Sequence, residues 1–311
     1  MKKILLQNSL EVSEVCLGAM NFGTTVSKEE AYKTLDLYVE AGGNFIDTSN
    51  NYAHWQGTGD ESETLLGEWL RDRGNRDSLI IATKVGFDRH GEGAGLRREQ
   101  IEYWIDESLR KLGTEYVDIY YAHSDDAGTP IEETMEAFDS LVKKGKVRAL
   151  GNSNFDTCRE AEANMIAKEK GLTPYTMMQQ QFTYLNPKFG AAPKYVFNES
   201  VDRQRLRYLK EKNIPLVAYS CLCKGAYENP ARLPDAYEAG ERLEFIRNMA
   251  AERGVNPSAL VIAWLLNLYK LENYPRVIPL FSATTSHLSD NLRGLDIELT
   301  TDELLAINSV N

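Results

Sequence analysis

Four polar residues stand at, or a few positions after, the ends of short apolar runs in this sequence: Asp47, Tyr52, Lys84 and His123. Runs of β-branched and aromatic residues are typical of buried parallel strands. The carboxyl ends of parallel strands meet at one rim of a sheet or barrel, and α/β folds place their chemistry at that rim. We therefore expect these four side chains to lie close together.

Together the four residues could protonate a carbonyl oxygen. A tyrosine is an effective acid near neutral pH only if a nearby cation brings its pKa well below about 10. Lys84 is expected to be the cation beside Tyr52, Asp47 to orient Lys84, and His123 to bind and orient a polar group of the substrate. The protein offers no redox centre of its own, so we expect a nicotinamide cofactor to provide the hydride.

The elements that position these residues alternate between strand-like and helix-like stretches about every 30 to 40 residues. Helix start signals occur at Ser27 and Pro130. Eight strand-like segments can be counted, which predicts a closed (β/α)8 TIM barrel, an α/β fold, rather than an open sheet; no Gly-x-Gly-x-x-Gly turn follows the first one. The segments are 15–17, 44–47, 79–84, 117–121, 147–151, 176–180, 216–219 and 277–280.

Nothing in the sequence has the composition of a linker, so residues 1–311 are predicted to form a single domain. Two connecting stretches are longer than the simple strand-helix repeat requires. Residues 184–201 are expected to form a long rim loop after the sixth strand, a candidate lid over substrate or cofactor. Residues 225–239 are expected to form a second irregular rim loop after the seventh strand.

The charge composition of the chain limits the classes of partner that it can bind. The formal net charge of −11 and the pI near 5.0 argue against nucleic acid or an anionic membrane as the main partner. The apolar run near the start is too short for a signal-peptide core, and no run approaches the length of a membrane span. We expect a cytoplasmic protein whose partner is a small molecule.

Cysteine and histidine usage predicts neither a disulfide framework nor a metal site. Four scattered cysteines in a chain of 311 residues fit a reducing compartment. The four histidines are dispersed and lack partners at ligand spacing, so no metal is predicted.

At this point the sequence resembles the aldo-keto reductase family over nearly its whole length. The strongest pieces lie at Leu17-Gly18 with Phe22-Gly23, at Phe45 to Tyr52, at Gly59 to Gly67, at Ala82-Thr83-Lys84 and at Gly151 to Phe155. The resemblance implies that Asp47, Tyr52, Lys84 and His123 are the catalytic tetrad, with Tyr52 as general acid. It also implies an NAD(P)H-dependent reduction of an aldehyde or ketone to an alcohol.

The same resemblance implies a set of cofactor-binding residues. Ser153, Asn154 and Gln180 would bind the nicotinamide carboxamide, and Tyr219 would stack on the nicotinamide ring. Ser220 and Leu222 begin the turn that would receive the pyrophosphate.

One segment departs from the family pattern. After the eighth strand, family members place a Lys or Arg that pairs with the 2′-phosphate of NADP, and here Thr284 occupies that position. Ser282, Thr284, His287 and Asn291 are nevertheless predicted to line the cofactor site, since hydroxyls at a helix amino terminus can bind phosphate. We therefore expect NADP, with NAD as the alternative.

The expected substrate-facing residues are Trp55, Asn51, Phe87 and Asp125. Aromatic faces flanked by amide and carboxylate groups suit polyhydroxylated ligands. A carbohydrate or sugar-like carbonyl is therefore the first candidate substrate.

Two other interpretations remain open. A lysine at a barrel strand end can be the nucleophile of a Schiff-base aldolase or lyase, which would show no dependence on nicotinamide. A regulatory subunit would bind cofactor while turning over poorly. The sequence does not decide the oligomeric state or the direction of the reaction.

Overall fold

The computed structural model describes residues 1–91, 93–188 and 201–310. Eight parallel strands form a closed barrel in the order β10-β3-β4-β5-β6-β7-β8-β9. This ring of strands, each connected to the next through helical segments, confirms the predicted (β/α)8 fold. The chain divides into two compact units, residues 2–178 and residues 179–311 with Met1, which are described in turn; the prediction of a single domain stays a prediction.

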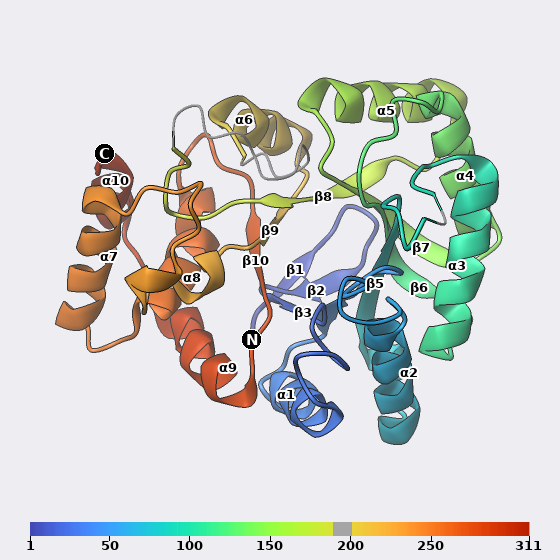
Figure 1. Cartoon of the computed structure of the whole chain (residues 1–311). Coiled ribbons are helices and arrows are strands. Elements are labelled where there is room, and N and C mark those ends of the chain that lie inside the picture. Colours follow the sequence, from blue (N-terminus) through green and yellow to red (C-terminus); the bar gives the residue numbers. More distant parts are fainter. Residues whose placement is uncertain (92, 189–200, 311) are drawn as a thin grey trace. The chain divides into compact units, whose positions relative to one another are not determined.

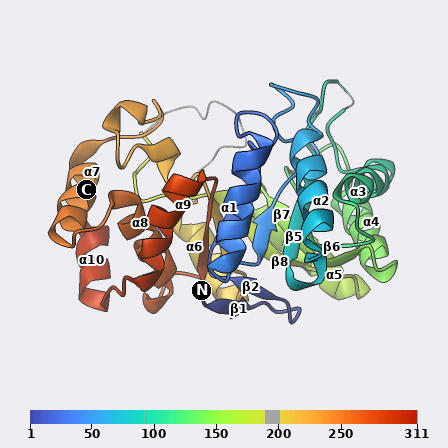
Figure 2. The ribbon, with the colours of Figure 1, turned by 90° about the horizontal axis from the view of Figure 1, so that it is seen from below.

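The N-terminal unit (residues 2–178) carries most of the barrel strands and their helices. Helices α2, α3, α4 and α5 follow one another along its outer side (Figures 1 and 2). Its elements are β1 Lys3–Leu5, β2 Glu11–Ser13, β3 Cys16–Gly18, α1 Lys28–Glu40, β4 Phe45–Asp47, α2 Glu61–Arg73, η1 Arg76–Ser78, β5 Ile80–Val85, α3 Arg98–Leu112, β6 Val117–Ala122, α4 Ile131–Lys143, β7 Val147–Ser153, α5 Thr157–Lys170 and β8 Tyr175–Gln181.

The C-terminal unit (residues 179–311) completes the strand set. Its helix α8 is apolar all round and buried over most of its length, and it packs against β10, α7 and α9. The elements are α6 Arg203–Lys212, β9 Leu216–Tyr219, η2 Cys223–Gly225, η3 Pro230–Arg232, α7 Gly240–Glu252, α8 Pro257–Asn267, η4 Leu268–Lys270, β10 Val277–Phe281, α9 Thr285–Leu292, η5 Arg293–Asp296 and α10 Thr301–Ser309.

All eight predicted strands are present, with ends shifted by at most two residues. The prediction succeeded because a strand covered on both faces is a continuous apolar run: every residue of β5 and β6 is buried. The hairpin of β1 and β2 was not predicted. Its strands have only three residues each, too few to show an alternating pattern.

The predicted helix boundaries also have local physical causes. The Ser27 hydroxyl accepts a hydrogen bond from the Glu30 amide and caps α1, and Pro130 immediately precedes α4. Gly74 and Gly113 end α2 and α3 in the left-handed conformation that glycine adopts without steric cost.

The two predicted rim loops are described to different extents. Most of residues 184–201 lies outside the described residues. Residues 226–239 contain a short 3-10 turn at Pro230–Arg232, and Tyr237 forms a bridge with Pro187; their role as a rim loop stays a prediction. Within the described ranges, no helix has both the length and the apolar character that crossing a membrane requires.

A cluster of charged residues near the start of β6 links neighbouring strands through hydrogen bonds and ion pairs. The fully buried Asp118 carboxylate accepts hydrogen bonds from the Ile81 amide at 2.9 Å, from Arg76 at 2.8 Å and from Arg148 at 2.8 Å. These residues are far along the strands from Lys84 and His123, at the end of a barrel where side chains serve stability rather than chemistry.

We predict that Asp118→Ala lowers the free energy of unfolding by about 3 to 5 kcal/mol, because it leaves the buried Ile81 amide without its acceptor and the largely buried Arg76 guanidinium without its counter-ion. Arg148→Ala is the matched control: the Arg148 side chain is 49% exposed, and its loss should cost about 1 kcal/mol or less. Urea unfolding followed by circular dichroism measures both. Equal losses in the two variants would show that Asp118 is no more than a surface ion-pair partner.

Candidate active site

Lys84 is the centre of the site predicted from sequence. It lies near the end of β5 and its side chain is fully buried. Its Nζ donates to Asp47 Oδ2 at 2.6 Å, to the Thr48 carbonyl oxygen at 2.6 Å and to the Tyr52 hydroxyl at 2.7 Å. An ammonium has three N–H donors and each finds an acceptor here, so the site is built for the charged form of the lysine.

Two opposing effects act on this lysine. Burial lowers the pKa of Lys84 below its ordinary value, while the adjacent Asp47 carboxylate opposes the shift. The ammonium therefore depends on Asp47 for its charge. A change that removed the carboxylate would leave a buried cation without a counter-ion.

Tyr52 lies in the turn after β4 and is half-buried. Its hydroxyl accepts the hydrogen bond from Lys84 and donates to Asp47 Oδ2 at 3.0 Å. Lys84 Nζ also lies 4.5 Å from the centre of the Tyr52 ring. A cation in this place stabilises the phenolate that remains after the hydroxyl gives up its proton.

His123 follows β6, and its backbone amide donates to the Val85 carbonyl oxygen at 2.7 Å. Its ring centre lies 4.4 Å from that of Phe87 and 5.9 Å from that of Tyr52. Burial, followed by the positive charge of Lys84, lowers the pKa of His123 well below its ordinary value. The imidazole is therefore neutral near pH 7.

Residues flanking the tetrad hold it in place. The Ser62 hydroxyl bonds the Thr48 hydroxyl at 2.7 Å and donates to the Ala19 carbonyl oxygen. Glu63, fully buried on the same helix, accepts a hydrogen bond from Thr83 at 2.6 Å. Thr48 follows Asp47 and Thr83 precedes Lys84, so the Ser-Glu pair of α2 braces both strand ends. The sequence marked this pair as part of a motif without revealing that role.

Comparison with known proteins decides the family. The model of the aldo/keto reductase family matches residues 14–311. The chain belongs to this family. It is similar to norsolorinic acid reductase of Emericella nidulans, at 32% identity over 96% of this chain and 78% of that protein. It is also similar to an NADP(+) aryl-alcohol dehydrogenase of Phanerodontia chrysosporium, at 29% identity over 96% of this chain and 82% of that protein.

A solved structure agrees with this assignment. The fold matches that of a thermostable aldo-keto reductase in complex with the inhibitor epalrestat, with a TM-score of 0.77, 25% identity and full coverage of both chains. As an aldo/keto reductase the chain is an oxidoreductase that uses a nicotinamide cofactor and acts on a small-molecule carbonyl compound.

In this aldo/keto reductase, two of the predicted carboxamide ligands lie beside the tetrad. Ser153 ends β7 and is buried. Asn154 has a left-handed backbone, and its Nδ2 donates to the His123 carbonyl oxygen at 2.8 Å and to Ser153 Oγ at 3.0 Å. Gly151, earlier in β7, leaves room for the Tyr121 ring, which a Cβ atom at this position would overlap.

The predicted substrate-facing residues differ in their exposure and in the contacts that they already make within the protein. Asn51 is buried and engaged by Ser49, and Phe87 packs on His123. Trp55 is 57% exposed. Its ring contacts the neighbouring His54 ring edge to face. Asp125 is held by Arg159, whose Nε lies 3.0 Å from the nearer carboxylate oxygen. A substrate hydroxyl would have to compete with a guanidinium for Asp125.

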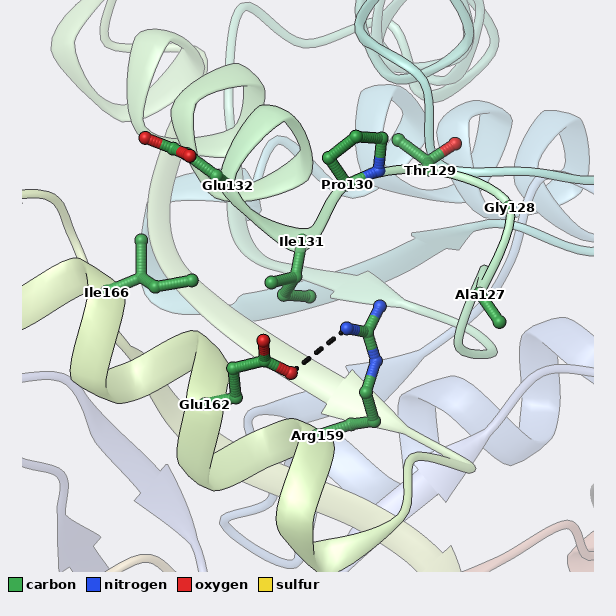
Figure 3. Close-up of a pocket in the computed structure, with 9 residues that line it drawn as sticks. All are labelled: Ala127, Gly128, Thr129, Pro130, Ile131, Glu132, Arg159, Glu162 and Ile166. Carbon is green, nitrogen blue, oxygen red and sulfur yellow. Dashed lines mark hydrogen bonds and ion pairs between the residues drawn. The ribbon is translucent and has the colours of Figure 1, made fainter.

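Arg159 also borders a surface pocket of about 440 Å³ between the loop before α4 and helix α5 (Figure 3). Arg159 pairs there with Glu162, and Glu132 projects from α4. None of the predicted catalytic residues lines this pocket. The Arg159 guanidinium is already paired with the Asp125 and Glu162 carboxylates, so a ligand in this pocket would have to compete with them for it.

The remaining predicted cofactor residues belong to the C-terminal unit. Tyr219 ends β9, and burial raises its pKa above the ordinary value. Ser220, the next residue, has a left-handed backbone (φ 52°). Cys223 and Lys224 also have left-handed backbones. Thr284 is the cap residue of α9, and its hydroxyl lies 3.0 Å from His287 Nδ1. The others are Gln180 on β8, Leu222 beside η2, the exposed Ser282 and the buried Asn291.

Burial adds Gln179 as a candidate beside the predicted Gln180, since both side chains are buried. The Tyr121 hydroxyl donates to Met177 Sδ at 2.7 Å, whereas Tyr175, two residues earlier on β8, packs on Phe138 of helix α4. Side chains two apart on a regular strand share a face, so β8 departs from simple alternation and the strand pattern does not choose between Gln179 and Gln180. Residues 179, 180 and 181 are all glutamine, so the sequence does not choose between them either.

No group of three or more His, Cys, Asp or Glu side chains suited to a metal is found within residues 1–91, 93–188 and 201–310. The four cysteines are free, and three of them are buried.

The buried His123 leads to a prediction about pH. The unfolded chain binds a proton near pH 6.5 and the folded protein only at lower pH, so the stability linked to neutral His123 is present above pH 6.5 and is lost as the pH falls below it. We expect His123→Gln to reduce the loss of folding stability between pH 7.5 and 5.5. One such group changes the free energy of unfolding by at most about 1.4 kcal/mol per pH unit. Urea midpoints across this range measure the slope. An unchanged slope would mean that His123 is protonated equally in both states.

Proposed function

We propose that this aldo/keto reductase reduces an aldehyde or ketone to an alcohol with NADPH, with Tyr52 as general acid. The observation that carries the proposal is the hydrogen-bonded contact of the Tyr52 hydroxyl with the buried Lys84 ammonium and the Asp47 carboxylate. The dihydronicotinamide supplies the hydride when it is bound.

Each residue of the tetrad then has one task. Tyr52 turns its O–H from Asp47 toward the substrate oxygen and transfers the proton as negative charge develops on that oxygen. Lys84 stabilises the resulting phenolate, and Asp47 keeps Lys84 charged. The neutral ring of His123 binds a polar group of the substrate without bringing a second cation close to Lys84.

The chemistry of the residues fits a dinucleotide. The buried Ser153 hydroxyl can bond a carboxamide, because it both donates and accepts. In the C-terminal unit, Ser220, Cys223 and Lys224 have left-handed backbones, a conformation that also occurs in anion-binding turns. Tyr219 is the aromatic face proposed for the nicotinamide ring.

The preference for NADP rests on hydroxyls rather than on a cation. Ser282, Thr284 and Ser286 stand at the amino terminus of α9, where hydroxyls and amides together can bind a phosphate. His287 lies against Thr284 and adds a polar ring. One similar protein is named as an NADP(+) enzyme, which supports the same choice.

For the substrate we propose a hydroxylated, sugar-like carbonyl compound. Asn51 and Phe87 border the tetrad and offer the amide and the aromatic face that such a molecule requires. An aromatic carbonyl is the second candidate, since one similar protein is named for aryl alcohols. The free cysteines support a reducing compartment such as the cytoplasm.

The two other interpretations are less well supported. A Schiff-base enzyme requires a lysine with a free lone pair, whereas every N–H of Lys84 is directed to an acceptor. A purely regulatory subunit would not need the hydrogen bonds that join Asp47, Tyr52 and Lys84.

We predict that Tyr52→Phe lowers kcat by at least about 100-fold, because only the proton donor is removed. Affinity for NADPH, measured by fluorescence titration, should change less than about 2-fold. Tyr116→Phe, on a half-buried tyrosine bonded to Asp77, is the matched control and should keep full activity. A Tyr52→Phe enzyme with near-normal kcat would remove Tyr52 as the acid.

We predict that Thr284→Arg raises the preference for NADPH over NADH by at least about 10-fold, because a guanidinium forms charge-assisted hydrogen bonds with the 2′-phosphate. The measurement is the ratio of kcat/KM for the two cofactors. Thr284→Gln, similar in reach but uncharged, should change the ratio little. If the ratio does not move with arginine, the phosphate site has been misplaced.

A further inference from the structure

Arg89, in the loop after β5, has a buried guanidinium. The residue is 8% exposed, whereas arginine is rarely buried unless it is paired. Its Nε donates to the Thr58 carbonyl oxygen at 2.9 Å, and its Nη1 donates to the Asn50 carbonyl oxygen at 3.3 Å. These two carbonyl groups stand on either side of Tyr52 in the chain. One guanidinium therefore joins both ends of residues 50–58, the Tyr52 turn.

A buried guanidinium requires a counter-ion, and Asp60 provides it. Arg89 Nη1 lies 2.8 Å from Asp60 Oδ1, on the residue that precedes α2. Burial favours the neutral form of Asp60, but the hydrogen bonds from Arg89 and Lys111 outweigh this effect and lower the pKa of the carboxyl. Asp60 is therefore charged near pH 7, and its carboxylate helps to hold the guanidinium in one orientation.

The end of the Tyr52 turn passes closely over the guanidinium. The next residue, Gly59, has a left-handed φ of 87°, and a Cβ atom there would lie 3.0 Å from Arg89 Nε and 3.1 Å from His54 Cβ. Glycine is the residue that fits this conformation and this close approach. The neighbouring His90 adds a second link, because its Nε2 lies 3.1 Å from the Gly57 carbonyl oxygen. The loop after β5 thus contacts the turn at three carbonyl groups.

We propose that Arg89 is a positioning residue: by binding the Asn50 and Thr58 carbonyl oxygens it fixes the backbone of the Tyr52 turn, and thereby the place of the Tyr52 hydroxyl beside Lys84. This inference rests on the proposed role of Tyr52 as general acid. Lys84 of β5 holds the hydroxyl at 2.7 Å, and Arg89 of the following loop holds the backbone that carries the ring.

Turnover should depend on this contact more than folding does. A displacement of about 1 Å at a reacting group can lower a rate about 100-fold. The fold keeps other supports when Arg89 is changed, because Lys111 still pairs with Asp60 and Lys84 still pairs with Asp47. An Arg89 variant is therefore expected to fold and to bind cofactor but to turn over slowly.

Hydrogen exchange tests the effect on the turn without any turnover. The His54, Gln56 and Gly57 amides donate to carbonyl oxygens within the turn, so their exchange reports its opening. In Arg89→Ala, peptides that cover residues 50–58 should exchange about 10-fold faster, and peptides from β4 and β5 should change less than about 2-fold. Arg110→Ala, at an exposed arginine of α3, is the control and should change neither. Unchanged exchange of the turn in Arg89→Ala would overturn the proposal.

Kinetics tests the link to Tyr52. With NADPH and glycolaldehyde, Arg89→Ala should lower kcat about 10- to 100-fold, while the affinity for NADPH, measured by fluorescence titration, changes less than about 2-fold. In the Tyr52→Phe background the same change should lower the residual kcat less than about 2-fold, because no proton donor is left to position. Equal losses in the two backgrounds would overturn the proposal and make Arg89 a general support of the fold.

Two further measurements separate the geometry of Arg89 from its charge. Added guanidinium ions should raise the kcat of Arg89→Ala at least about 3-fold, and ammonium ions at the same concentration should not, because only the planar guanidinium bonds several acceptors at fixed angles. Arg89→Lys keeps a cation beside Asp60, which protects the fold, but its kcat should remain at least about 5-fold low. Rescue by ammonium, or full activity in Arg89→Lys, would show that charge alone suffices and would overturn the proposal.

A failure of the reductase function can be told apart from a failure of this inference. If the unmodified protein reduces no carbonyl compound with NADPH, the reductase function is wrong, and the exchange of residues 50–58 still decides whether Arg89 fixes the turn. If the unmodified protein reduces glycolaldehyde and Arg89→Ala does so with an unchanged kcat, the reductase function stands and the positioning role of Arg89 is wrong.

Discussion

A buried ammonium is the constraint on which the site depends. Removing a lysine from water costs several kcal/mol, and the attraction of one carboxylate compensates only when the geometry is good and every N–H is bonded. Here the Asp47 carboxylate, the Thr48 carbonyl oxygen and the Tyr52 hydroxyl meet that condition around Lys84. The same three bonds that stabilise the cation also place it against the Tyr52 hydroxyl.

The barrel provides the required precision through strand register. Asp47 on β4 pairs with Ala82 on β5, and Lys84 pairs with Tyr121 on β6. Parallel pairing therefore places Asp47 next to the strand of Lys84 and two residues before it. The Ser62 and Glu63 contacts from α2 then hold the adjacent Thr48 and Thr83. Sites built on such rigid elements hold their side chains more accurately than sites built on loops alone.

The sequence predicted those parts of the fold and site that depend on local pattern. The central strands are short apolar runs of the kind typical of buried strands, and Asp47, Lys84 and His123 stand at or just after their ends. Tyr52 was predicted to lie beside Lys84, and the resemblance to the family agreed; the structure bonds its hydroxyl to Lys84. The family and the barrel are confirmed. The individual catalytic roles remain predictions.

The remaining features depend on contacts between residues distant in the sequence. No local pattern shows that Arg159 engages Asp125, or that Ser49 lies against His123 across 74 positions. The three-residue strands of the first hairpin pair without any periodic signal. The choice between Gln179 and Gln180 does not follow from strand alternation, and three consecutive glutamines give no indication of it.

The most direct test of the account is to follow the hydride. The purified protein would be incubated with NADPH deuterated at the transferred position of the dihydronicotinamide and with glycolaldehyde, and the product analysed by mass spectrometry. The account predicts one deuterium on the former carbonyl carbon of the alcohol, formed by the unmodified protein and lost in Lys84→Met. Alcohol without deuterium, or a borohydride-trapped adduct on Lys84 in place of alcohol, would contradict it.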